Sequence, residues 1–143
     1  MTLRLALLRE EGVRAGLPPL RRDAPSRARR SYALQLANPA EATLLAVDRG
    51  KAVGILRCTI SGEVSPARQT CFAFLTSAYV VPSHRRRGVM RRLLSAADAW
   101  CRFRQLSEMR LHVQWENVAG NAAWDALGFD AIEVRRRRVV PER

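Results

Sequence analysis

One stretch, from Tyr79 to Leu94, constrains the fold of this chain more than any other. It is the end of an apolar run closed by Pro82, then a basic loop ending at Gly88, then apolar residues at helical spacing. This order of elements is typical of a phosphate-binding site, because the first helical N–H groups lack intrahelical partners and the helix dipole attracts anions. Gly88 lets the backbone approach an anion closely. Positive charge is added by three consecutive arginines: Arg85, Arg86 and Arg87.

The rest of the sequence predicts one α/β domain over residues 1–143, because alternating and helical apolar patterns follow each other without a linker. Residues 3–8 fit either a strand or the start of a helix. Helices are predicted over 26–37, 89–106 and 117–127, with Asn117 as the N-cap of the last one. Strands are predicted over 43–47, 52–60, 70–81, 110–115 and 131–140, and the first two form a hairpin. Residues 61–66 are predicted to be a loop.

Two motifs in this frame resemble a known family. The first, Val80-x-Pro82-x-x-Arg85-x-x-Gly88, is similar to the acetyl-CoA signature of the GNAT superfamily of N-acetyltransferases, with Met90 where the family usually has Gly or Ala. The second resembles the family's L-x-V-x-x-x-N and Y-x-x-x-G-F segments. It comprises Leu111-x-Val113-x-x-x-Asn117, then Trp124 in place of the usual Tyr, then Gly128-Phe129.

The resemblance implies a mixed, strongly twisted sheet of six to seven strands, flanked by helices and splayed between its fourth and fifth strands. Acetyl-CoA would be the co-substrate, with its pantetheine arm in the splay and no metal required. The CoA contacts implied are Ala78, Tyr79, Val80, Arg85, Arg86, Arg87, Gly88, Val89, Met90, Arg91, Asn117 and Trp124. In the family the first helices wall the acceptor site. Five arginines there are either substrate contacts or a solvated helix face: Arg21, Arg22, Arg27, Arg29 and Arg30.

Acetyl transfer to an amine needs a group that accepts the proton of the amine and a donor that stabilises the carbonyl oxygen as it becomes anionic. The departing thiolate benefits from a proton. His112 is the favoured base, since an imidazole suits proton abstraction at neutral pH, and Glu116 is the alternative. The resemblance implies that a backbone N–H near Val80 stabilises the oxygen. Trp124 cannot release a proton as the usual Tyr does, so the hydroxyl of Tyr79 or Ser77 serves as acid or the thiolate leaves unassisted.

The charge of the chain points to an anionic partner but does not choose one. The 25 basic and 13 acidic residues give a net charge of +12, nearly all of it from arginine. CoA, an acidic substrate or nucleic acid would each fit as the partner. A GC-rich genome would also explain the arginine content without any partner. An Arg-rich nucleic-acid-binding or CoA-binding regulatory module without catalysis is therefore the alternative to an enzyme. Like-charge repulsion disfavours a polycationic acceptor unless acidic residues such as Glu63 or Glu116 line its pocket.

The remaining features narrow the class further. Cys58, Cys71 and Cys101 form no C-x-x-C motif, so a disulfide framework or a zinc site is not expected, and Cys71 is assigned to the core. The apolar run from Leu3 to Leu8 is too short and too charged for a signal peptide or a membrane span. We therefore expect a cytoplasmic monomer or homodimer that acetylates an amine. Its acceptor is a metabolite, an aminoglycoside-like amine, a peptide N-terminus or a lysine.

Overall fold

The computed structural model of the protein describes residues 2–14, 18–65 and 68–140. The chain divides into two compact parts, residues 1–112 and 113–143, and each is treated by itself below. Within the described residues, no helix is both long and apolar enough to cross a membrane. The same ranges contain no cluster of three or more His, Cys, Asp or Glu side chains placed to hold a metal ion.

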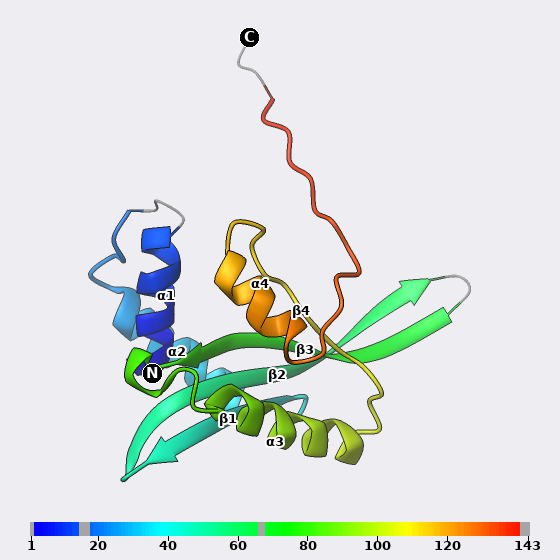
Figure 1. Cartoon of the computed structure of the whole chain (residues 1–143), viewed down its shortest axis with the longest axis horizontal. Coiled ribbons are helices and arrows are strands. Elements are labelled where there is room, and N and C mark those ends of the chain that lie inside the picture. The colour runs from blue at the N-terminus through cyan, green and yellow to red at the C-terminus, as the bar shows by residue number, and fades with distance from the viewer. Residues whose placement is uncertain (1, 15–17, 66–67, 141–143) are drawn as a thin grey trace. The chain divides into compact units, whose positions relative to one another are not determined.

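Within the described residues, the first part contains three helices, four strands and one short 3-10 helix. Figure 1 labels the helices and strands. In chain order they are α1 (Thr2–Arg14), α2 (Ala24–Leu36), β1 (Glu41–Asp48), β2 (Lys51–Ser65), β3 (Arg68–Val80), the 3-10 turn Pro82–His84, α3 (Val89–Phe103) and β4 (Met109–Leu111). The predicted hairpin, central strand and two helices are confirmed. The predicted loop over 61–65 is wrong, because β2 continues to Ser65 and pairs with β3 to the end; Pro66 lies outside the described residues.

The strands form one mixed sheet in the order β1-β2-β3-β4. β1, β2 and β3 are antiparallel neighbours, and β4 runs parallel to β3. The predicted mixed α/β architecture is therefore confirmed, but the described sheet has four strands instead of six or seven. Residues 3–8 are helical, so they add no strand, and β4 ends at Leu111 rather than Trp115.

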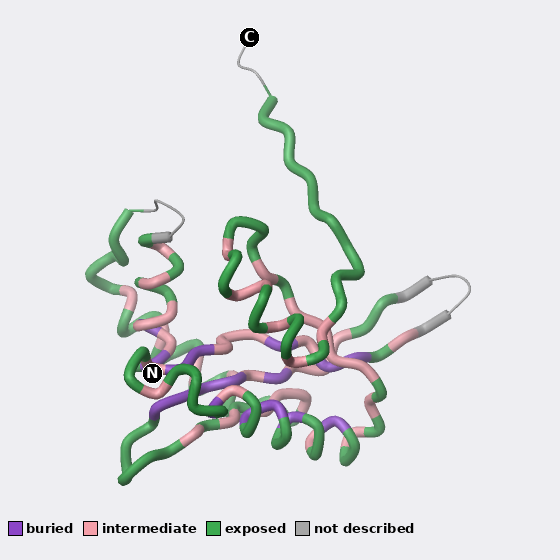
Figure 2. Tube along the Cα trace, in the orientation of Figure 1, coloured by how far each residue is buried: buried purple, intermediate pink, exposed green. Residues whose placement is uncertain are grey.

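Helices cover both faces of this sheet. On one face Leu3 of α1 packs against Ile55 and Tyr79. On the other face α3 buries the apolar stripe Val89, Leu93, Leu94, Ala97 and Cys101, and Figure 2 shows this buried side of α3 turned toward the strands. The cysteines divide differently from the prediction, because Cys58 and Cys101 are buried while Cys71 is exposed. Burial raises the pKa of the Cys58 thiol to about 12, which makes it a poor nucleophile.

The close approach of β2 to α3 depends on Gly54. A Cβ at this position would lie 3.0 Å from Val89 Cγ1 and 3.2 Å from Leu93 Cδ1. We expect Gly54→Leu to lower the free energy of unfolding by about 1–3 kcal/mol, because the larger side chain overpacks this contact. Urea denaturation would measure the loss.

Gly62→Leu is the matched control for Gly54, because Gly62 lies on the same strand but outside the core, with its nearest Cβ contact at an ordinary 3.5 Å. We expect this control to change stability little. An equal loss in the two variants would show that the α3 contact is not what Gly54 protects.

The second part contains one described helix, α4 (Val118–Asp125), followed by a chain without regular structure from Phe129 to Val140. The predicted N-cap is confirmed, because Asn117 Oδ1 accepts a 3.2 Å hydrogen bond from Gly120 N. The predicted strand over 131–140 is wrong. These residues are exposed, and four consecutive arginines, 135–138, place charge on both faces that a strand would present.

Candidate functional site

The loop between β3 and α3 has the backbone conformation of an anion site. After Pro82, His84 N donates to Val81 O at 2.9 Å and Arg85 N donates to Pro82 O at 3.2 Å. Arg86 (φ 58°) and Gly88 (φ 75°) then adopt left-handed conformations, and Arg87 between them does not. Backbone nests bind anions through successive N–H groups and contain left-handed residues, so the φ values of Arg86 and Gly88 fit a nest.

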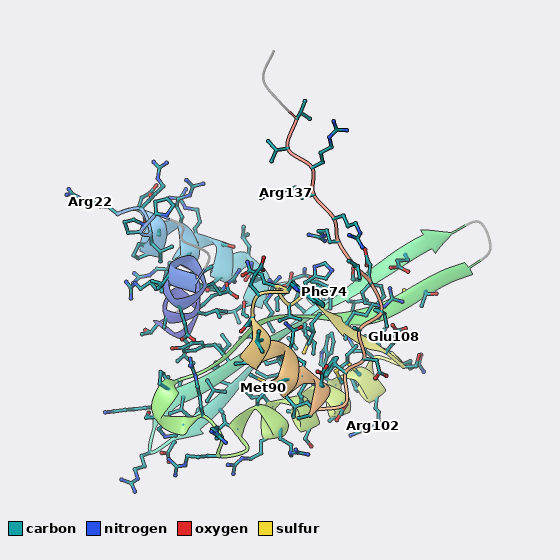
Figure 3. All side chains as sticks on the ribbon, turned by 45° about the horizontal axis from the view of Figure 1, so that its top comes forward. Arg22, Phe74, Met90, Arg102, Glu108 and Arg137 are labelled. Atoms are coloured by element: carbon teal, nitrogen blue, oxygen red, sulfur yellow. The ribbon has the colours of Figure 1, made fainter. Side chains whose placement is uncertain are left out.

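This loop leads directly into the N-terminus of α3. Arg92 N donates to Gly88 O at 3.1 Å, which is a bond of the first helical turn. The N–H groups of Val89, Met90 and Arg91 precede that bond and have no acceptor within the helix. Val89 is buried against the sheet, so the helix end is fixed in place beside the loop. The left-handed residues of the loop, the helix N-terminus and the neighbouring arginines therefore occupy consecutive positions; Met90, in the first turn of α3, is labelled in Figure 3.

The three predicted phosphate-binding arginines differ in what they contact. Arg86 and Arg87 are exposed. Arg85 instead donates from Nε to Val80 O at 2.9 Å and from Nη2 to Glu10 Oε2 at 2.6 Å. Its guanidinium also lies 5.4 Å from the centre of the Tyr79 ring. The hydrogen bond to Glu10 raises the pKa of Arg85 above its ordinary value. Arg85 thus connects the loop to α1, a contact between residues 75 positions apart that the sequence pattern did not indicate.

A second contact fixes the same loop to the hairpin turn between β1 and β2. His84 Nε2 lies 3.0 Å from Asp48 Oδ2, and His84 Nδ1 lies 2.9 Å from Ser83 Oγ. Both ring nitrogens of His84 therefore have neighbours within the protein. This geometry favours a role for His84 in anchoring the loop to the hairpin.

The sheet opens next to this loop. Residues Leu75 and Leu111 form the last described pair between β3 and β4. A bulge follows in β3, where Ser77 and Ala78 together oppose Leu56 and Ser77 has a φ of 53°. The backbone of β3 beyond Leu75 is therefore not paired to β4 within the described residues. The end of pairing at this point agrees with the predicted splay between the fourth and fifth strands.

Thr76 lies at the start of the opening, and sequence reasoning did not select it. Its Oγ1 is buried and has no hydrogen-bond partner among the described residues. A buried hydroxyl without a partner loses its hydrogen bonds to water, so it favours a ligand that restores one. The available signal was the adjacent hydroxyl pair Thr76 and Ser77 within the largely apolar stretch of β3 from Phe72 to Val80.

The candidate catalytic residues lie in both parts of the chain. His112 follows β4 directly and is exposed, with its ring 4.9 Å from the Phe74 ring at 74°. Tyr79 is buried in the cluster with Leu3 and Ile55. Glu116 is exposed in a turn of the second part. Trp124, also in the second part, packs its ring 5.3 Å from that of Phe129.

Comparison with known proteins identifies relatives with the same architecture. The model of the acetyltransferase (GNAT) family matches residues 9–129. An aminoglycoside N(6')-acetyltransferase type 1 from Klebsiella aerogenes is 34% identical over 98 residues, which cover 68% of this chain and 64% of the relative. The chain thus spans less than two thirds of the length of the curated relatives that it matches first.

Solved structures agree with this match. The apo aminoglycoside 6'-N-acetyltransferase AAC(6')-Ig from Acinetobacter haemolyticus is 27% identical, with a TM-score of 0.72 and coverage of 86% of both chains. AAC(6')-Iy in complex with the bisubstrate analogue CoA-S-monomethyl-acetylneamine is 26% identical, with a TM-score of 0.69 and coverage of 88% of this chain and 83% of that one. Together with the loop, the splay and the family match, these findings place the chain in the GNAT family of acetyltransferases.

Proposed function

We propose that the chain is a single acetyltransferase domain that moves the acetyl group of acetyl-CoA to a primary amine of a small molecule by direct attack. The observation that carries the proposal is the nest from Arg86 to Gly88 leading into the free N–H groups at the start of α3. That arrangement fits a pyrophosphate, because backbone donors and the helix dipole act on the same anion.

The CoA contacts proposed are those of the loop, the adjoining strand and the second motif. Ala78, Tyr79 and Val80 are assigned to the pantetheine arm, because they lie on the part of β3 that is not paired to β4 within the described residues. The phosphates are assigned to residues 85–91, with the nest and helix end as the main donors and Arg86 and Arg87 as exposed charges. Asn117 and Trp124 remain proposed contacts from the second part of the chain.

The proposed chemistry uses His112 as general base on the attacking amine, with Glu116 as the alternative. A backbone N–H near Val80, beside the bulge at Ser77, would donate to the carbonyl oxygen as it becomes anionic. The thiolate would leave unassisted or with a proton from the hydroxyl of Tyr79 or Ser77. Burial of Tyr79 under Arg85 favours a packing role for its ring. Thr76 Oγ1 adds a hydrogen-bonding group at the opening of the sheet.

An aminoglycoside is the acceptor suggested by the relatives, whose names give this substrate class at 30–34% identity. The net charge of +12 opposes a polycation, and Glu63, one of the two acidic residues invoked for such a pocket, forms a 2.6 Å ion pair with Arg110. The non-catalytic CoA-binding or nucleic-acid-binding alternative is less favoured, because the relatives are named as acetyltransferases. A cytoplasmic location and a monomer or homodimer stay part of the proposal.

The proposal is tested by thiol release from acetyl-CoA in the presence of single amines. The panel contains neamine, 4-(aminomethyl)benzoate, 4-(aminomethyl)benzyl alcohol and a short peptide with a free N-terminus. We expect at least one amine to release CoA in a ratio of one to one with its acetylated product, measured by mass spectrometry. Binding of acetyl-CoA with no turnover of any amine class would favour the regulatory alternative, and absence of binding would contradict the CoA site.

The ion pair between Glu10 and Arg85 gives a separate prediction. Both side chains are more than one third exposed, at 34% and 40%, so solvent screens the pair. We expect Glu10→Gln to lower the free energy of unfolding by less than about 1 kcal/mol. We also expect it to tighten acetyl-CoA binding by about twofold at low salt, because it removes a negative charge beside the phosphate site.

Titration calorimetry at low and high salt measures this effect, and the gain should disappear at high salt. Glu11→Gln is the matched control, since Glu11 is the neighbouring exposed carboxylate on the same helix. A tenfold loss of affinity in Glu10→Gln alone would contradict the prediction and show that the fixed position of Arg85 matters more than its charge.

A further inference from the structure

A pocket of about 630 Å³ lies where α1, the segment before α2, and α2 itself come together. Its volume is in the range of small-molecule sites, which run from about 300 to 1,000 Å³. It lies in the first part of the chain but shares no lining residue with the loop 82–88. Arg22, labelled in Figure 3, belongs to the same segment before α2.

The charge lining this pocket is unbalanced. Four arginines contribute to the lining: Arg4, Arg21, Arg27 and Arg30. Asp23 is the acidic residue among those that line it, and its carboxylate is shared between Arg21 at 3.3 Å and Arg27 at 3.8 Å. Within the described residues, Arg4 and Arg30 have no carboxylate partner. The lining therefore carries a net positive charge at a concave site, where a field acts on a ligand more strongly than on a flat surface.

Arg4 is also held in position by neutral groups. Its Nη1 donates to Gln35 Oε1 at 2.8 Å, and its guanidinium carbon lies 4.8 Å from the centre of the Tyr32 ring. Both partners come from α2, and Arg4 is half-buried between the helices. A guanidinium that is partly removed from water and lacks a counter-charge favours an incoming anion. Its orientation is fixed beforehand, which lowers the entropy cost of binding.

The rest of the lining is apolar. Leu8, Leu20 and Leu34 are exposed there, and Ala24 and Ala28 complete the wall on α2. Exposed leucines beside arginines suit a ligand that has an apolar body and an anionic head. We propose that the pocket between α1 and α2 binds a small organic anion, a carboxylate or phosphate ester attached to an apolar group.

This site bears on the acceptor of the proposed reaction. An amine that also carries a carboxylate would be attracted by the pocket, whereas a polycation would be repelled by its arginines. Binding to the pocket does not itself depend on acetyl transfer. The two proposals can therefore fail separately.

Three compounds with one apolar body test the charge preference: 4-phenylbutyrate, 4-phenylbutanol and 4-phenylbutylamine. Each is titrated into the ¹⁵N-labelled full chain without acetyl-CoA, and amide shifts report both affinity and location. We expect 4-phenylbutyrate to bind about tenfold more tightly than the alcohol, and the amine to bind no better than the alcohol. The shifts should occur in α1 and α2 and leave residues 82–91 unchanged.

Arg30→Gln should lower the affinity for 4-phenylbutyrate about tenfold, because it removes a positive charge from the lining that has no carboxylate partner among the described residues. Arg102→Gln on α3, labelled in Figure 3, removes the same charge from an exposed position outside the lining and should leave the affinity unchanged. Arg4→Gln is a second test with circular dichroism as its folding control. Any one of three results would overturn the proposal. The first is an equal loss of 4-phenylbutyrate affinity in Arg30→Gln and Arg102→Gln. The others are equal affinities for the three compounds and amide shifts confined to residues 82–91.

Turnover rates then show whether the bound anion is part of the acceptor amine or a separate ligand. Acetylation of 4-(aminomethyl)benzoate at least about tenfold faster than of 4-(aminomethyl)benzyl alcohol, lost in Arg30→Gln, would identify the anion as part of the acceptor. Binding of 4-phenylbutyrate without that preference would support an organic-anion ligand other than the acceptor. The site would be refuted, with acetyl transfer intact, by two results together. The protein would acetylate neamine faster than 4-(aminomethyl)benzoate, with no change in Arg30→Gln, and 4-phenylbutyrate would not bind.

Discussion

Gly88→Glu is expected to abolish the rise in melting temperature that acetyl-CoA gives the wild-type protein. A ligand that binds only the folded state stabilises it by about 2.7 kcal/mol when the free ligand concentration is about one hundred times the dissociation constant. The substitution places a carboxylate where the phosphates would approach the backbone and strains a left-handed residue with φ of 75°. A Cβ at this position would meet no heavy atom within 4 Å, so the protein itself should still fold.

Gly50→Glu is the matched control for this experiment. Gly50 has a φ of 76° and equally open surroundings, so the substitution adds the same charge and a similar backbone strain. We expect Gly50→Glu to lower the melting temperature of the free protein while keeping the acetyl-CoA shift. Gly88→Ala should keep part of the shift, because it adds strain without charge. A full shift in Gly88→Glu would contradict the assignment of this loop to the phosphates.

Local sequence patterns were sufficient to predict the elements whose conformation depends on neighbouring residues in the chain. The hairpin between β1 and β2 is one example, since Arg49 (φ 47°) and Gly50 (φ 76°) take the two positive φ values that a tight hairpin turn needs. α3 is another, because its apolar stripe has the helical period and is buried as expected. The phosphate loop is a third, since its Pro, Arg and Gly positions act through their own backbone.

Contacts between distant residues were not predictable in the same way. The bond from Arg85 to Glu10 depends on how α1 lies on the sheet, which no local pattern specifies. The bulge at Ser77 and Ala78 depends on pairing with β2, because a register shift is a property of two strands. The residues from Ser61 to Pro66 predict a loop, yet pairing with β3 extends β2 through Ser65.

The sequence also overestimated two strands. Residues 112–115 alternate in polarity, but the described pairing with β3 stops at Leu111. Residues 131–140 contain valines and an isoleucine of high strand propensity, yet they lie exposed without regular structure. Propensity alone does not form a strand, because each strand needs a neighbour to satisfy its backbone groups.

His112→Ala is expected to lower kcat/KM for the best amine by about 10²–10⁴-fold, the usual contribution of a positioned general base. The proposed geometry places the imidazole just after β4, next to the point where β3 and β4 stop pairing. Acetyl-CoA binding should remain nearly unchanged, because the loop 82–88 does not contact this residue in any described interaction. Steady-state kinetics by thiol release and calorimetry with acetyl-CoA measure the two effects separately.

The contact between His112 and Phe74 supplies a control for structure. His112→Phe keeps an aromatic ring beside Phe74, where the imidazole now lies at 4.9 Å, but cannot accept a proton. If His112 is the base, both variants lose activity equally. If its ring only packs against β3, His112→Phe retains activity and the assignment to catalysis fails.

The pH profile distinguishes a base from a positioning residue. A protonated imidazole cannot accept the proton of the amine, so the wild-type profile should show an acid limb, beyond the ionisation of the amine itself, that both His112 variants lose. His84→Gln should keep it, since His84 is the other histidine of the chain and lies against Asp48. An unchanged profile in the His112 variants would transfer the role to Glu116. If Glu116→Gln were silent as well, the amine would arrive neutral, and the protein would contribute positioning and the oxyanion contact.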